Sequence, residues 1–207
     1  MISPARTPRP PNICSAWSIT HWAFSVAGGA ETLLVELANP MAENLGVMRV
    51  SLVPALLRTL AAALRRGEED VRLFEEGPAF LARPHDGEGE SATPAEERPV
   101  VAVVASGADG PRHFLHAPRA VDVLTVKGAI LEALVAGGAA REDLAVVPAD
   151  VPRCAPGAAE IRWRGRRIGW LGRVHPNELR ALEVEAPVVA AEADLTDVLA
   201  AGLAPLG

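Results

Sequence analysis

The fold is best predicted from residues 51–75, SLVPALLRTLAAALRRGEEDVRLFE, where a helical pattern is followed by a strand pattern. Apolar residues recur at three- and four-residue intervals in the first part, which gives a helix with one apolar face. Ser51 can cap this helix, Pro54 lies in its first turn, and Gly67 follows its end. In Asp70–Glu75 the side chains alternate between the two sides of the chain, as in a strand.

The remainder of the chain predicts more strands than helices. A second helix is expected over Leu124–Val135, and short helices over Pro176–Leu182 and Leu195–Ala201. Most strands follow one another directly, so the predicted fold class is α+β, an antiparallel sheet flanked by helices, with the helices on one face. The predicted strands are Trp17–Phe24, Thr32–Leu37, the central Val100–Ala105, Leu144–Val147, Ala159–Trp163, Arg167–Gly172 and Val188–Ala193, with a hairpin turn at Gly165.

The length of 207 residues fits one domain. We expect a flexible, Pro-rich tail at residues 1–14 and a single core domain at 15–207. Within the core, residues 84–99 are rich in Gly, Glu and Pro and have few apolar side chains, which predicts an exposed acidic loop.

Composition excludes several classes of function. The formal charge of −6 argues against a main role in gripping nucleic acid, because phosphate binding needs a basic surface. Cys14 and Cys154 are too far apart for a zinc spacing. No apolar run reaches the length of a membrane span, and the first residues do not form a signal peptide. These features predict a soluble, cytoplasmic protein that does not bind membranes.

No catalytic, cofactor-binding or metal-binding residues are predicted. The sequence contains neither glycine-rich phosphate-binding pattern. His113 and His116 have no acidic or cysteine partner at ligand spacing. Glu75 and Glu76 are neighbours on a strand and point to opposite faces, which favours a charged pair at a strand end over a catalytic carboxylate pair.

Four blocks, in order, resemble the central part of the phenylalanine–tRNA ligase beta subunit family. The first two are NPMAENLGVMRVSLVPALL at residues 39–57 and DVRLFEEGPAF at 70–80. The other two are VDVLTVKGAILEAL at 121–134 and GRRIGWLGRVHP at 165–176. One departure is Cys154–Ala158, where the family has a His-Pro-Gly-x-Ser pattern.

The resemblance implies a class II aminoacyl-tRNA synthetase-like core without catalytic activity. Active relatives stabilise the charge on ATP with one arginine on the strand after the long helix and another after a Gly-rich strand. Here the corresponding stretches are Gly77–Phe80 and Val188–Leu195, which contain no arginine. This predicts a pseudo-active site. The chain would hold no cofactor, and ATP and magnesium would be used by the partner subunit.

The resemblance also implies a catalytic alpha subunit as partner, with tRNA contacted only indirectly. Self-association is a further expectation. The alternatives are that Met48 and Leu52 belong to the interior and that Arg49 pairs with a nearby acid such as Glu43. A free-standing paralogue that binds a small molecule or a protein is the rival function, and an active enzyme is a third. The candidate interface residues are Asn39, Pro40, Met41, Val47, Met48, Arg49, His175 and Pro176.

Overall fold

The computed structural model describes residues 35, 37, 46–82, 95–110, 114–115 and 118–202. The expected tail 1–14, the strand Trp17–Phe24 and most of Thr32–Leu37 lie outside these residues. The elements, in chain order, are α2 (Val53–Arg65), β1 (Val71–Ala82), β2 (Ala95–Ser106), β3 (Ala108–Asp109), β4 (Arg119–Ala120), α3 (Val123–Ala136), the 3-10 turn η3 (Arg141–Asp143), β5 (Leu144–Pro148), β6 (Ala159–Trp163), β7 (Arg166–Arg173), α4 (Pro176–Arg180), β8 (Val188–Asp194) and α5 (Thr196–Gly202).

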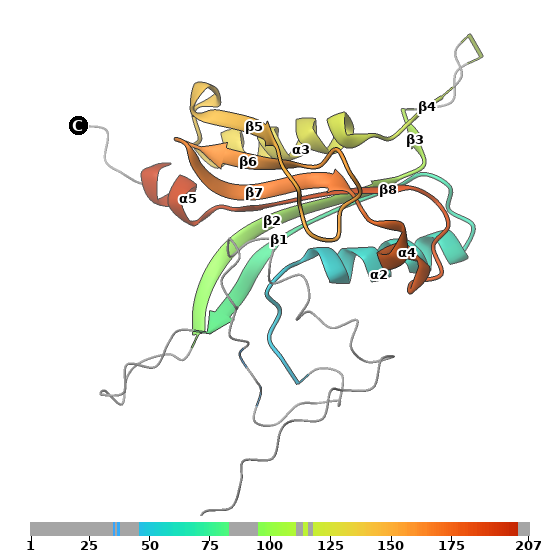
Figure 1. The fold of residues 1–207 in the computed structure, drawn as a ribbon, viewed down its shortest axis with the longest axis horizontal. Helices are drawn as coiled ribbons and strands as arrows, with labels where there is room; N and C mark the ends of the chain where they lie inside the picture. Colours follow the sequence, from blue (N-terminus) through green and yellow to red (C-terminus); the bar gives the residue numbers. More distant parts are fainter. Residues whose placement is uncertain are drawn as a thin grey trace, which may run out of the picture.

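A six-stranded sheet organises the described residues, with the strand order β1-β2-β8-β7-β6-β5 (Figure 1). Every neighbouring pair in this sheet is antiparallel. The predicted α+β class and the antiparallel sheet are therefore confirmed. The strand predicted to be central, β2, has a neighbour on each side, β1 and β8.

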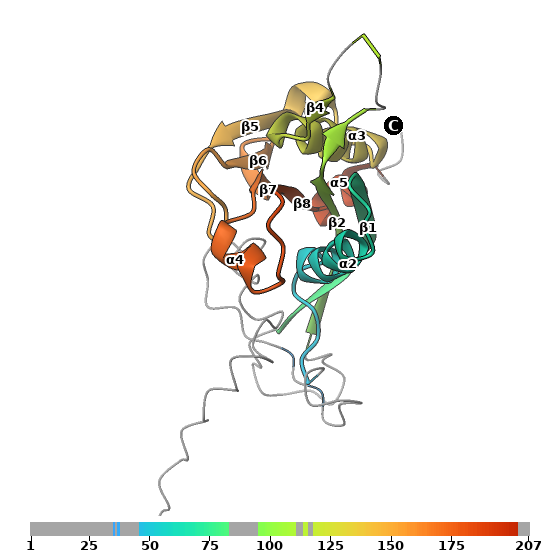
Figure 2. The same cartoon turned by 90° about the vertical axis from the view of Figure 1, so that its right-hand side faces the viewer.

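The helices lie on both faces of the sheet, so the prediction of helices on one face is wrong. α2 and α4 pack on one face, and α3 and α5 pack on the other (Figure 2). The reason is that the central strands are apolar on both sides, since successive residues of a strand point to opposite faces. In β2, Val100 and Val104 face α2, whereas Val101 and Ala105 face α3.

The β1–β2 ribbon is longer than the sequence predicts. β1 continues to Ala82, and β2 begins at Ala95, so the last five residues of the expected acidic loop, 95–99, belong to a strand. Their charges are accommodated in ion pairs: Arg98 lies 2.8 Å from Glu96 and 3.6 Å from Asp194. The expected loop is therefore wrong at this end. Residues 83–94 lie outside the described part of the chain.

The hairpin predicted at Gly165 is confirmed. Arg164 and Gly165 connect β6 to β7, and both have positive φ, +50° and +78°. This is the geometry of a two-residue type I′ turn, whose twist matches that of the flanking strands. A glycine at the second position allows this conformation without steric cost.

Candidate functional site

Three of the candidate interface residues, Asn39, Pro40 and Met41, lie outside the described residues. The next three form a partly buried segment beside β1. Its backbone is held on both sides: Met48 N donates to Val35 O at 2.9 Å, and Phe80 N donates to Arg49 O at 2.8 Å. The segment is therefore fixed against the far half of β1.

Arg49 ties this segment to β1 through its side chain. Its guanidinium forms an ion pair with Glu75, and its Nε donates to Pro78 O at 2.8 Å. Gly77 makes room for it, because a Cβ there would lie 2.5 Å from an Arg49 nitrogen. Arg49 therefore does pair with an acid, but Glu75 lies 26 residues away in the sequence. Glu43, the local acid named as the alternative, lies outside the described residues.

The other two candidates, His175 and Pro176, form the corner between β7 and α4. His175 caps the helix, since its Nδ1 accepts a hydrogen bond from Asn177 N at 3.2 Å. Its backbone N donates to Arg153 O at 2.8 Å. Pro176 is the exposed first residue of α4. The two candidate groups thus sit on different elements, one along β1 and the other at α4.

A cleft of about 580 Å³ lies against this corner. Its walls come from the end of β7, from α4 and from the loop before β8. The floor is apolar, and four charged side chains line it: Arg173, Arg180, Glu183 and Glu185. Sequence reasoning missed this cleft because the loop that closes it has no pattern of its own, and Glu183 turns the chain with a φ of +58°. The His-Pro pair was its only sequence signal.

The most unusual polar group is Glu192, which is fully buried in the middle of β8. Both its carboxylate oxygens accept from Ser51 Oγ at 2.9 Å, and Oε1 also accepts from Leu52 N at 2.7 Å. Ala102 and Trp170 lie beside it on the neighbouring strands. The carboxylate therefore sits at the N-terminus of α2, where the backbone N–H groups and the helix dipole favour negative charge.

Burial dominates the titration of this carboxyl group. Desolvation raises the pKa of Glu192 to about 7, and the hydrogen bonds from Leu52 N, Ser51 and Trp170 only partly offset it. The cap expected at Ser51 is also revised by this contact. α2 begins at Val53 with Leu52 as its N-cap residue, and the side chain of Leu52 itself makes no capping hydrogen bond. Ser51 instead accepts from Val53 N at 3.2 Å while it donates to Glu192.

The two stretches expected to form the pseudo-active site lie on strands that both flank β2, namely β1 and β8. The face toward α2 presents Glu75 paired with Arg49, the apolar Ala102, and the sealed Glu192. α2 packs directly on this face, and Leu52, Leu57 and Leu60 have no exposed surface. Chemically, this face is a closed core with one internal carboxyl group.

A metal centre, a membrane span and a reactive thiol are further classes of site that these residues could form. Within the part of the chain that the structure describes, no three His, Cys, Asp or Glu side chains gather as metal ligands. None of the described helices is both long and apolar enough to cross a membrane. Cys154 is buried, and burial raises the pKa of its thiol to about 12, so it is no thiolate nucleophile at neutral pH.

The fold defines a class: an α+β domain built on one antiparallel sheet, with helices packed on both of its faces. The family model for the phenylalanyl tRNA synthetase beta chain CLM domain matches residues 16–195. The chain belongs to the phenylalanyl tRNA synthetase beta chain family, in agreement with the four sequence blocks.

Individual relatives agree with this assignment. The chain is 33% identical over 177 residues to the phenylalanine–tRNA ligase beta subunit of Paramagnetospirillum magneticum, and 36% identical over 182 residues to that of Rhodospirillum rubrum. It is 38% identical over 163 residues to that of Xanthomonas oryzae pv. oryzae. These matches cover 85%, 86% and 78% of this chain, but only 21%, 21% and 20% of the relatives. The chain thus spans about a fifth of their length.

Proposed function

We propose that this chain is a class II synthetase-like core without catalytic activity, which acts as a structural partner of the catalytic alpha subunit in charging tRNA with phenylalanine. Family membership supports the assembly. The single observation that carries the non-catalytic role is the sealed carboxyl group of Glu192 under α2. A nucleotide brings several negative charges, and a site for it needs cations and open volume. This face offers an acid, apolar side chains and a covering helix.

The proposal has consequences for ligands and location. ATP and magnesium would be used by the alpha subunit and not by this chain. Contact with tRNA would be indirect, because the net charge of −6 offers little attraction to phosphates. The assembly would work in the cytoplasm, where tRNA is charged.

The test combines activity and association. Alone, the chain should not catalyse phenylalanine-dependent exchange of pyrophosphate into ATP. Mixed with the alpha subunit from the same cell, it should form a heavier species in sedimentation velocity. Pro176→Glu should weaken that association if the His175–Pro176 corner belongs to the interface, whereas Pro148→Glu, an exposed proline at the end of β5, should not. Exchange activity that a substitution in this chain abolishes would overturn the non-catalytic role.

The cleft beside α4 favours a second candidate, a free-standing regulator that binds a small molecule or a protein. Its apolar lining residues, together with two arginines and two glutamates, are typical of a site that orients a polar ligand. The discriminating result is the absence of any association with the alpha subunit, combined with loss of a bound ligand in Leu179→Asp or Arg180→Glu variants that retain their fold.

A further inference from the structure

Among the residues that the structure describes, strand β1 at one edge of the sheet is only partly covered. Its far half meets the segment that ends at Arg49, through the bonds to Phe80 N and Pro78 O. At its near end the chain leaves the edge at Asp70, whose carboxylate accepts from Ala108 N at 2.6 Å. Between these two points lies the stretch Val71–Gly77, which we call the open edge.

The backbone of the open edge has outward-pointing groups. Phe80 N points away from β2, and strand residues alternate in this respect. The N–H and C=O groups of Arg72, Phe74 and Glu76 therefore also point outward. Within the described ranges 46–82, 95–110, 114–115 and 118–202, these groups have no backbone partner. An edge of this kind is a template for another strand.

The side chains of the same three residues form a symmetrical pattern. Phe74 lies at the centre of the open edge, opposite Val103 of β2, with 77% of its surface exposed. The exposed Arg72 and Glu76 lie two residues to either side of it, on the same face of the sheet. Arg72 uses Nη2 for Ala108 O and Asp109, so its other donors can still bind an acid.

We propose that the open edge Val71–Gly77 binds the open edge of a second copy of this chain, antiparallel, around a two-fold axis at Phe74. In this register the two Phe74 side chains meet, and Arg72 of each copy lies opposite Glu76 of the other. A parallel arrangement would place like charges together. The self-complementary order of Arg72, Phe74 and Glu76 thus selects an isologous contact between identical chains. The two sheets become one continuous sheet.

The first test is sedimentation equilibrium of the chain over a range of concentrations. The wild type should dimerise reversibly. Glu76→Arg should raise the dissociation constant about tenfold or more, because it places arginines opposite each other at two symmetric positions. Glu142→Arg makes the same charge change on exposed residue 142, next to the opposite edge strand, and should leave the constant unchanged. The double variant Arg72→Glu/Glu76→Arg should restore dimerisation.

A crosslinking test does not depend on these charges. Directly opposed residues of a hydrogen-bonded antiparallel pair have Cα atoms about 5.5 Å apart, which a disulfide can span. In a Cys14→Ser background, Phe74→Cys should give a covalent dimer under mild oxidation. Leu124→Cys, at a position 63% exposed on α3, should stay monomeric. A strict monomer, a dimer insensitive to Glu76→Arg, or equal crosslinking of both cysteine variants would overturn the proposal, as would occupation of the edge by another protein's strand.

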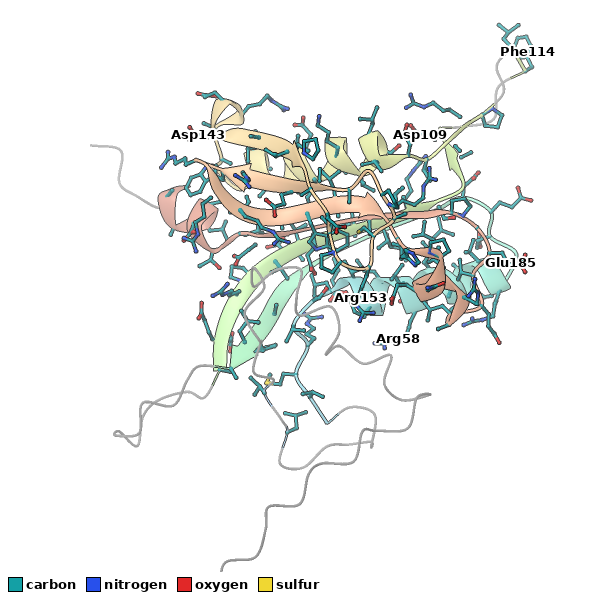
Figure 3. The ribbon with its side chains drawn as sticks, viewed as in Figure 1. Arg58, Asp109, Phe114, Asp143, Arg153 and Glu185 are labelled. Atoms are coloured by element: carbon teal, nitrogen blue, oxygen red, sulfur yellow. The ribbon has the colours of Figure 1, made fainter. Side chains whose placement is uncertain are left out.

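Figure 3 shows a second exposed feature, Phe114, far from the body of the molecule beyond Asp109. It is 90% exposed, and its neighbour Leu115 is 65% exposed. This pair makes a useful internal control, because Phe114→Ser should not alter dimerisation through the open edge.

Discussion

The N-termini of α2 and α3 are stabilised in opposite ways. At α3 the cap is local: Asp122 accepts from Leu124 N at 2.9 Å and from Thr125 N at 3.1 Å, and Thr125 Oγ1 accepts from Asp122 N at 3.3 Å. At α2 the cap is tertiary. Leu52 N donates to Glu192, which lies 140 residues further along the chain, on β8. The first cap can form in an isolated helix, whereas the second requires the folded sheet.

The two caps also differ in cost. Asp122 is partly exposed, so its charge remains hydrated while it binds the helix. Glu192 is fully buried, and its charge is stabilised only by the helix terminus, Ser51 and Trp170. A buried carboxyl group that loses its hydrogen-bond partners lowers the free energy of unfolding. Loss of the carboxyl group has the same effect, because its buried donors are then left without an acceptor. We therefore expect α2 to be coupled to β8 and α3 to be locally stable.

The largest effect should come from placing a charge on the buried face of α2. Leu60 has no exposed surface and lies in the core between α2 and the sheet. Leu60→Asp should leave the protein unfolded or insoluble, because a lone buried carboxylate costs several kcal/mol, roughly the stability of a whole domain. The matched control is Leu124→Asp on α3, where the leucine is 63% exposed. Circular dichroism melts should show cooperative unfolding for the control only.

Removal of the tertiary cap should have the next largest effect. Glu192→Ala leaves Ser51 Oγ and Leu52 N without their acceptor and opens a cavity beside Trp170. We expect a loss of about 2–4 kcal/mol in the free energy of unfolding, measured by urea denaturation at pH 5, where the buried carboxyl group is protonated. Amide exchange should rise at the start of α2 more than at the start of α3. Equal exchange at both helices would contradict the coupling of α2 to β8.

The pH dependence of stability gives a separate test of the same group. Its pKa is raised to about 7 in the folded protein from an ordinary value of 4.5, so the folded state holds this proton more tightly than the unfolded state. The contribution of Glu192 to the free energy of unfolding is fully present below pH ~4.5 and is lost as the pH rises through about 7. The full change is about 3 kcal/mol, since one pKa unit corresponds to ~1.4 kcal/mol. Glu192→Gln should flatten this part of the pH profile relative to the wild type.

The smallest effect should come from the local cap. Asp122→Ala removes the acceptor for Leu124 N and Thr125 N, which the nearby solvent can partly replace. We expect a loss of about 1 kcal/mol, the usual value for a helix N-cap. Asp122→Asn should recover most of it, because the amide oxygen still accepts. A loss as large as that of Glu192→Ala would remove the distinction between the two caps.

Much of the fold could be predicted from local patterns. The apolar face of α2, the Gly137–Gly138 stop of α3 and the Arg164-Gly165 turn each depend on residues close in sequence, and each is confirmed. The number of covered faces was not predictable in the same way. A strand that is apolar on both sides is compatible with helices on one face of the sheet or on both faces. The choice between them depends on what packs against each side, and the strand's own sequence does not contain this information.

The candidate site also has features that the sequence predicts and features that depend on tertiary contacts. The four sequence blocks establish the family, and the lack of arginines in Gly77–Phe80 and Val188–Leu195 motivates the non-catalytic role. The pairing of Arg49 with Glu75 requires β1 to lie beside residue 49, which no local pattern indicates. The cleft at α4 likewise exists only because three segments meet there.

The sequence by itself determined the family, the α+β class and the places where most strands and helices lie, because these depend on short-range periodicity, turn residues and motifs in order. Only the tertiary structure decided where Glu192 lies. Along the chain it is an ordinary acid in an apolar strand. In the sheet, β2 and β7 flank it and α2 covers it, so its carboxyl group meets the backbone of a helix from the other half of the molecule. Such contacts arise from the pairing of distant strands, and no pattern within one segment encodes them.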